Sequence, residues 1–488
     1  MNTFLGGYLF FLVAYFVAVF YFNSAIKPRQ RKMAWGIGIV LLMVPIVDLG
    51  FPAQQNAGAG ENTSDLGILA RLRGKYDLGE ATLGQVDPSS SAMNLVLLGL
   101  RGPAASVLHL KAIEYQDRKL WAKLKATVDS IILLQPHYVQ IWKFQGWNLA
   151  YNVSREWDKV DDRFYWVKEG IKFLILGTER NSTVPILFHN VGDFVSSKMG
   201  ISDEKKYFRA FFKSDPDPKF EGAADGAINP GGLDSYLVAK SWFLKANDKD
   251  DNDGITNNVK GMTHVFFRQG PAKAQLSYAE SRSKEGDFDS HLPAWIEGYD
   301  DWTLKYGNMI FLGLDDKKYK LECTEDELKE LAEENGITVA QQRRLWSSNL
   351  DMVNYRHWKN FANIEKDPAS LQAHKVFYAA KQAYIEGRGF DKVATDGTTE
   401  VSEAQTLLES AMTQWRELST RKDFADLYSQ DQYIREALLI VQYWQAVHQQ
   451  NGKDVPADYT LKAEWDKHPE QHMEMERQFL TETRSRSF

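Results

Sequence analysis

The sequence predicts an all-α protein in which two N-terminal transmembrane helices precede a long solenoid of helical hairpins. Three observations favour this class. Two uncharged, apolar runs lie within the first 51 residues, apolar residues recur with a helical period from about residue 66 onward, and alternating β-branched runs are scarce. The chain has 488 residues, 44% of them apolar, which is enough for several compact domains or one long solenoid.

The first apolar run, Phe4 to Phe22, carries no charge and is long enough to cross a bilayer at about 1.5 Å per residue. The second, Met33 to Phe51, is shorter and is interrupted by Pro45 and Asp48. Since Asp48 lies near the outer end of its span, we expect a solvated interfacial acid rather than an ion site. The lipid bilayer is therefore an expected partner.

Charge placement predicts the topology of these spans. Four lysine and arginine residues lie between positions 27 and 32, whereas no other appears until Arg71. The positive-inside rule puts this loop in the cytoplasm and both termini on the other side. The alternative is a cleaved signal peptide, with cleavage after the first run or near Ala53 to Gly60.

Composition excludes several classes of function. The net charge of −7 is mixed along the chain, so no basic surface is expected and nucleic acid is excluded as a partner. Cys323 is the only cysteine, which excludes an intrachain disulfide, a cysteine zinc cage and an iron–sulfur cluster. No nucleophile-elbow, P-loop or dinucleotide glycine motif occurs. We predict no enzyme, no catalytic residue and no cofactor.

Local signals place several helices and loops. Thr324-x2-Glu327 and Thr338-x2-Gln341 are capping boxes that open helices, and Asp431 to Gln450 is expected to be the last long helix. Loops are expected at Asp215 to Gly232 and at Asn247 to Asn258, with one helix between them.

These signals divide the chain into six segments. They are a transmembrane hairpin (1–52), a tether with initial helices (53–104), repeats (105–213), an irregular insertion with one helix (214–262), helical hairpins (263–366), and a C-terminal helical region with its tail (367–488).

A repeated spacing underlies the solenoid prediction. The three matches are Leu108-x2-Lys111-Ala112-x2-Tyr115, Trp142-x2-Gln145-Gly146-x2-Leu149 and Phe188-x2-Val191-Gly192-x2-Val195. They resemble the tetratricopeptide repeat, whose period is 34 residues and which ends on a proline. The first two matches are 34 residues apart, and Pro136 ends the first. The third is displaced by 46, which predicts an insertion near Arg155 to Arg163. The alternative is an irregular helical domain that reproduces the pattern by chance.

A wider resemblance rests on four segments, Leu134 to Asp158 (LQPHYVQIWKFQGWNLAYNVSREWD), Gly170 to Asn181, Phe188 to Gly200 and Gly270 to Ser281 (GPAKAQLSYAES). They resemble an uncharacterised family of membrane-anchored helical proteins of planctomycete-type bacteria, over roughly residues 90 to 310. Some members carry the label "iron-responsive element". Because that term names an RNA structure, the label implies no function for this chain. The resemblance implies a bacterial, envelope-associated protein and supplies no catalytic residues. Combined with the topology predicted from charge placement, it leads us to expect a protein of the bacterial inner membrane whose soluble domain is extracytoplasmic, in the periplasm.

The repeat frame also predicts a partner-binding groove. The position after the first large residue of each match faces the concave surface, and the next helical turn lies beside it. The predicted groove residues are His109, Lys143, Trp147, His189 and Asp193. Cationic or titratable groups beside an aromatic ring suit a peptide or an acidic terminus. The alternative is that these residues pack against an additional helix.

Two weaker patterns point to metals, and neither is complete. His468-x3-His472 has Pro469 where the metalloprotease motif needs glutamate. Asp248 to Gly254 (DKDDNDG) would put Lys249 and Lys260 at the first and last ligand positions of an EF-hand. We therefore predict no metal site.

The sequence favours a protein-binding scaffold or a component of an envelope membrane complex, because solenoids provide extended binding surfaces. The alternatives are an envelope enzyme with an unrecognised helical active site and a small-ligand receptor. A closed pocket that holds coupled titratable groups would favour the enzyme.

Overall fold

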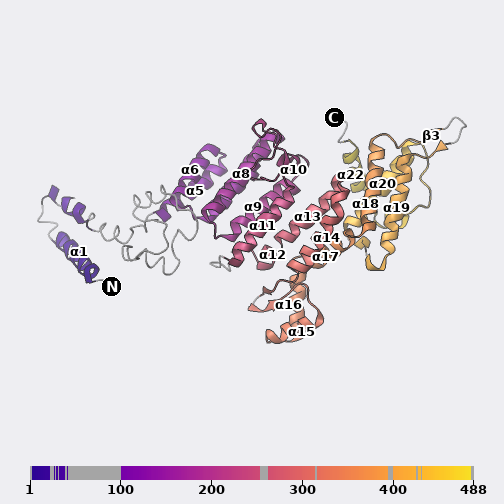
Figure 1. Cartoon of the computed structure of the whole chain (residues 1–488). Coiled ribbons are helices and arrows are strands. Elements are labelled where there is room, and N and C mark those ends of the chain that lie inside the picture. Colours follow the sequence, from indigo (N-terminus) through magenta and orange to yellow (C-terminus); the bar gives the residue numbers. More distant parts are fainter. Residues whose placement is uncertain are drawn as a thin grey trace. The chain divides into compact units, whose positions relative to one another are not determined.

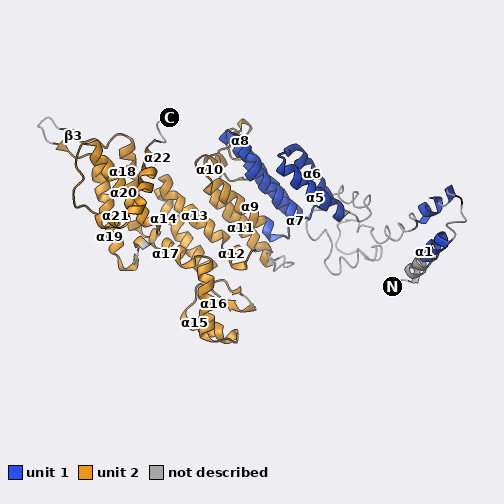
Figure 2. Cartoon of the chain, turned by 180° about the vertical axis from the view of Figure 1, so that it is seen from behind, with its two compact units in different colours: residues 1–187, 252–256 blue, residues 188–251, 257–488 orange. Residues whose placement is uncertain are grey.

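The computed structural model describes residues 3–21, 27, 29, 30, 32–38, 41, 101–252, 262–313, 316–393, 399–424, 427–429 and 431–484. These parts are mostly helical, which confirms the all-α prediction (Figure 1). The chain divides into two compact units, one comprising residues 1–187 with 252–256 and the other residues 188–251 with 257–488 (Figure 2).

The N-terminal region contains α1, Thr3–Tyr21. In the part of the chain that the structure describes, no helix is both long and apolar enough to span a membrane. The predicted second span and the predicted tether fall largely outside the described residues. The two transmembrane helices stay a prediction.

Unit 1 is built from two helical hairpins. The first pairs α5 (Arg101–Asp117) with α6 (Trp121–Leu134), and the second pairs α7 (Val139–Trp147) with α8 (Val160–Arg180). After α7 the helix widens into a π-helical segment, Asn148–Asn152, and a 3-10 turn, Val153–Glu156. The core of unit 1 includes Leu124, Val128, Ile131, Ile141 and Trp142. The helix α9, Pro185–Phe194, contains the boundary between the units.

The two helices of the second hairpin approach closely at a pair of glycines. A Cβ atom added at Gly146 would lie 2.7 Å from Leu174 Cγ, and one added at Gly170 would lie 2.7 Å from the Gly146 carbonyl oxygen. Trp142, one turn before Gly146, is fully buried and donates its indole N–H to the Pro136 carbonyl at 2.8 Å. The close approach predicted at Gly146 is therefore confirmed.

The other two repeat matches also place a small residue at a crowded position. Ala112 in α5 is fully buried. A Cβ atom at Gly192 in α9 would lie 2.9 Å from the ring of Phe243 and 3.1 Å from the Ala239 carbonyl oxygen. The small residue of each match is thus buried, and at Gly146 and Gly192 an added side chain would meet its neighbours at close range.

Unit 2 holds the remaining helices. Its first part contains η5 (Val195–Ile201), α10 (Lys205–Lys213), η6 (Pro218–Phe220), α11 (Ser235–Asn252), α12 (His264–Arg268), α13 (Gly270–Glu285), α14 (Phe288–Asp300) and η7 (Asp301–Tyr306). Its second part contains α15 (Glu325–Glu334), α16 (Val339–Met352), α17 (Tyr355–Glu365), α18 (Pro368–Ile385), α19 (Glu403–Thr420), η9 (Lys422–Phe424), η10 (Leu427–Ser429), α20 (Asp431–Gln450), α21 (Lys462–Lys467), η11 (Pro469–Gln471) and α22 (His472–Arg484).

Two antiparallel strand pairs interrupt the helices of unit 2. They are β1 (Phe311–Leu312) with β2 (Lys318–Tyr319), and β3 (Lys392–Val393) with β4 (Thr399–Glu400). Within unit 2, α15 and α16 stand apart from the other helices (Figure 1). The main hairpins of unit 2 are α13 with α14 and α18 with α19, and they share one large core.

Local capping explains where several of these helices begin and end. Both predicted capping boxes, at Thr324 and Thr338, are present, and α20 has the predicted bounds. Asp287 caps α14 by accepting from the Ser290 N–H, and Gly286, at φ +79°, ends α13 in the left-handed conformation that favours glycine. Gly286 and Asp287 together close the α13–α14 hairpin.

One predicted loop is partly wrong. Residues Asn247 to Asn252 belong to α11, and only the rest of the predicted loop to Asn258 lies outside the described residues. The acidic end of α11 stays helical because Arg268 neutralises it, binding Asp251 at 2.7 Å and also pairing with Asp250. Two carboxylates of the DKDDNDG pattern are thus engaged by an arginine.

Candidate functional site

Three of the predicted groove residues belong to unit 1. His109 is half-buried, with its ring 5.8 Å from Tyr138 and 5.6 Å from Phe144, and Lys143 is half-buried on α7. Trp147 is 44% exposed, and its ring stacks on Tyr151 at a centroid distance of 5.8 Å. His109 therefore packs against aromatic neighbours, whereas Trp147 offers its surface to solvent.

The other two predicted groove residues belong to unit 2. His189 is buried, with its ring 4.8 Å from that of Phe243 and 4.9 Å from that of Phe267. Asp193, one turn further along α9, is exposed. His189 thus packs against further elements, which is the alternative to a binding groove. Neither compact unit brings all five residues together.

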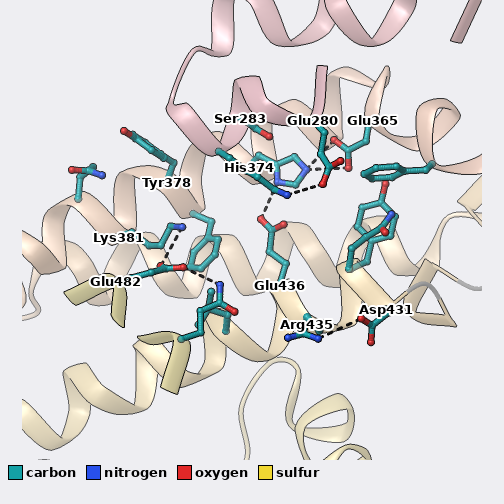
Figure 3. Close-up of a pocket in the computed structure, with 18 of the residues that line it drawn as sticks. Glu280, Ser283, Glu365, His374, Tyr378, Lys381, Asp431, Arg435, Glu436 and Glu482 are labelled. Carbon is teal, nitrogen blue, oxygen red and sulfur yellow. Dashed lines mark hydrogen bonds and ion pairs between the residues drawn. The ribbon is translucent and has the colours of Figure 1, made fainter. Parts of the chain in front are cut away.

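Unit 2 contains a cavity of about 740 Å³, within the range of roughly 300–1,000 Å³ typical of small-molecule sites. Its lining comes mainly from α13, α14, α17, α18, α20 and α22 (Figure 3). The lining includes Lys206, Glu280, Lys284, Trp295, Phe361, Glu365, His374, Lys381, Tyr433, Arg435, Glu436 and Glu482.

At the buried end of this cavity, His374 lies between two carboxylates from different helices (Figure 3). Its Nε2 is 3.0 and 3.1 Å from the two carboxylate oxygens of Glu365, the last residue of α17. Its Nδ1 is 2.9 Å from Oε1 of Glu436 on α20. The side chain of Glu365 is only 3% exposed and that of Glu436 is 26% exposed, so Glu436 is the more accessible carboxylate.

Electrostatics fix the charge of His374. Burial alone would lower its pKa, but Glu365 and Glu436 outweigh burial and hold the pKa of His374 well above its ordinary value. Burial would likewise raise the pKa of Glu365, yet the charge and hydrogen bonds of His374 bring it below its usual range. The result is an imidazolium held between carboxylates.

A second histidine contributes no further charge. His291 on α14 is fully buried, and its Nε2 lies 3.6 Å from Oε2 of Glu365. Burial is the main cause that lowers the pKa of His291, so this ring is neutral near pH 7. Neither of its ring nitrogens makes a hydrogen bond.

Aromatic rings form one wall of the cavity. Trp295 meets Phe361 edge to face at 4.9 Å, and Phe361 meets Tyr433 in the same way at 5.6 Å. The Tyr433 hydroxyl adds a favourable interaction with the Glu365 carboxylate, although it makes no well-formed hydrogen bond. The wall beside the charged cluster is therefore largely apolar.

The other ion pairs of the cavity lining are balanced within themselves. Lys284 binds Glu280 at 2.6 Å, Lys381 lies 3.5 Å from Glu482, and Arg435 pairs with Glu474. In each of these pairs one cation faces one carboxylate. The cluster around His374 differs from them, because there two carboxylates share one histidine.

The cluster predicts a pH dependence of stability. The raised pKa of His374 gives stabilisation that is complete below about pH 6.5 and is lost as pH rises through the folded-state pKa. The lowered pKa of Glu365 gives stabilisation present above about pH 4.5 and lost as pH falls through the folded-state pKa. We expect the melting temperature of the parent to fall on the alkaline side, and the difference from His374→Gln to shrink there. A parent advantage that grows steadily from pH 6.5 to 10 would contradict this assignment.

Sequence reasoning missed this site because its residues come from three helices. Glu365 and His374 are nine residues apart across a helix boundary, and Glu436 follows 62 residues later. A signal was present in α18, where His374 lies beside the buried face that contains Ala373 and Phe377.

The two histidines of the incomplete His468-x3-His472 pattern make different contacts. His468 lies near Glu470, whereas the His472 ring stacks on Trp465 at 3.8 Å. Over the described parts of the chain, no group of three or more His, Cys, Asp or Glu side chains is arranged to hold a metal ion.

No family model matches the chain, and no curated protein or solved structure matches it either.

Proposed function

We propose that this chain is a membrane-anchored, extracytoplasmic helical-repeat protein that binds other proteins as a scaffold or as part of an envelope membrane complex. The tetratricopeptide-like spacing and the resemblance to membrane-anchored planctomycete-type proteins support this proposal. The two apolar runs and the positive loop between them support the anchor.

The observation that carries the proposal is the exposed ring of Trp147. Large aromatic side chains are enriched among the residues that dominate binding energy at protein interfaces. Trp147 is 44% exposed, although Trp142 and Gly146 on the same helix are buried at the crossing with α8. Its stacking on Tyr151 holds a flat aromatic surface in place.

We expect Trp147→Ala to lose a protein that copurifies with the parent chain from native membranes, as measured by quantitative mass spectrometry. Trp157→Ala is the matched control, because Trp157 is 42% exposed in the same unit but does not belong to the repeat frame. Truncation of an interface tryptophan costs on the order of 2 kcal/mol or more, which is about 30-fold in affinity. An unchanged set of partners, or an equal loss in both variants, would count against the proposal.

The topology has a separate test. Alkaline phosphatase is active only outside the cytoplasm, so a fusion after Asp65 should be active if the loop between the spans is cytoplasmic. A green fluorescent protein fused at the same place should stay dark. An inactive phosphatase fusion at normal expression would contradict the proposed topology.

A small-ligand receptor is a second candidate, favoured by the cavity of unit 2. The cavity also holds interacting titratable groups, His374 with Glu365 and Glu436, which is one of the two features expected of an enzyme site. However, both ring nitrogens of His374 are bound by carboxylates, so neither is available to accept a proton from a substrate. This arrangement supports ligand binding more than catalysis.

A further inference from the structure

We propose that the cavity of unit 2 binds an organic cation, an ammonium or guanidinium group on a small apolar body, with Glu436 as its principal contact. The inference rests on the receptor candidate and adds the chemical class of its ligand. It follows from the charge count at the buried end of the cavity, from the aromatic wall beside it, and from the accessibility of Glu436.

The charge count leaves one negative charge uncompensated. His374 carries a single positive charge and binds both Glu365 and Glu436. His291, the other basic group beside Glu365, is neutral and adds nothing to this count. An unpaired charge that is removed from water is costly, and a ligand cation would offset that cost.

The basic residues elsewhere in the lining do not cancel this charge. Lys284, Lys381 and Arg435 each have carboxylate partners of their own. Lys206 also lines the cavity, but it is exposed, so water and salt screen its charge strongly. Charges at the buried end interact in a lower effective dielectric and dominate the preference.

The shape and polarity of the site favour an organic cation over a metal ion. Trp295, Phe361 and Tyr433 form an apolar wall beside the cluster, which suits the apolar body of an organic cation better than it suits a metal ion. A volume of about 740 Å³ exceeds what one ion needs. Among the described residues no set of three side chains is arranged for a metal.

Glu436 is the carboxylate that a ligand reaches. One of its oxygens accepts from His374 at 2.9 Å, and the side chain is 26% exposed, whereas Glu365 is bound by His374 through both oxygens. Glu436 therefore has remaining acceptor capacity, and a charge-assisted hydrogen bond to it is among the stronger contacts available.

The test titrates the full-length protein in detergent by isothermal titration calorimetry at pH 7.5. The probes are n-butylammonium, n-butanol and butyrate, which share one apolar body and differ in charge. We expect n-butylammonium to bind at least tenfold more tightly than either of the others. If n-butanol or butyrate binds as tightly as n-butylammonium, the cation preference is wrong, although the cavity still binds ligands. If no probe binds, both the cation preference and the ligand-binding role of the cavity are wrong.

Variants then locate the contact. Glu436→Gln should lower the affinity for n-butylammonium at least tenfold. The control is Glu280→Gln, which changes a carboxylate of the same lining that is paired locally, and it should change this affinity less than threefold. Circular dichroism and melting temperature check that both variants fold, and the preference among probes in the parent tests the proposal without any variant. Equal losses in the two variants would overturn the assignment to Glu436. A metal site is indicated instead if Zn²⁺ or Mn²⁺ binds the parent and displaces n-butylammonium but does not bind Glu436→Gln.

Discussion

Gly146→Leu is expected to lower the stability of unit 1 by about 1–3 kcal/mol or more through overpacking. The new Cβ alone would lie 2.7 Å from Leu174 Cγ and 3.3 Å from the Gly170 carbonyl oxygen. Gly170→Ala should be costly too, because its Cβ would lie 2.7 Å from the Gly146 carbonyl oxygen, a backbone atom that cannot rotate away. The remaining atoms of a leucine at position 146 have no space between α7 and α8.

Native-state hydrogen exchange measures this effect locally, which suits a chain with two compact units. Amides of α7 and α8 should exchange faster in both variants, while those of unit 2 keep the protection of the parent. Gly102→Ala is the control, since its Cβ would meet only Gln135 Nε2 at 3.5 Å and alanine favours a helix. Trp147→Ala should also cost less stability than Gly146→Leu. Full protection of α7 and α8 in Gly146→Leu would refute the repeat assignment and the groove built on it.

His374→Leu is expected to destabilise unit 2 by about 3–5 kcal/mol, the usual effect of removing one partner of a buried ion pair. The substitution keeps an apolar side chain at the site but leaves Glu365, which is 3% exposed, without its positive partner. It also removes the hydrogen bonds that join α17 and α20 to α18.

The double variant His374→Leu with Glu365→Gln separates charge from packing. If the buried carboxylate causes the loss, the neutral glutamine should recover part of the stability lost in His374→Leu. His468→Leu in the C-terminal region is the control. In this variant the opening free energies of α17, α18 and α20, measured by native-state hydrogen exchange, should change by less than about 0.5 kcal/mol. The proposed charge pairing would be contradicted if His374→Leu were as stable as the parent, or if the double variant recovered none of the stability that His374→Leu loses.

The parts of the fold that the sequence predicted are those fixed by nearby residues. A capping box needs only four residues, so the starts of α15 and α16 at Thr324 and Thr338 were predicted correctly. The crossing at Gly146 was predicted because the repeat places small residues at a known position. Gly170, the other half of that crossing, has no such pattern and was found only in the structure.

The parts that the sequence could not predict depend on contacts between distant residues. The local sequence at the end of α11 predicts a loop, because Arg268, which neutralises Asp250 and Asp251, lies 17 or 18 residues further along. The repeat period predicts a groove position for His189, because a period indicates the face of a helix but not what covers that face. The cluster of His374 needs three helices, and no local pattern reports their meeting.

Site-specific photocrosslinking tests the proposed protein-binding role most directly. A photoreactive phenylalanine derivative replaces Trp147 in one variant and Trp157 in another, and each is irradiated in native membranes. The proposal predicts a discrete crosslinked protein from position 147 that is absent from position 157. The absence of any crosslink from position 147 at normal expression, or the same products from both positions, would contradict a binding surface at Trp147.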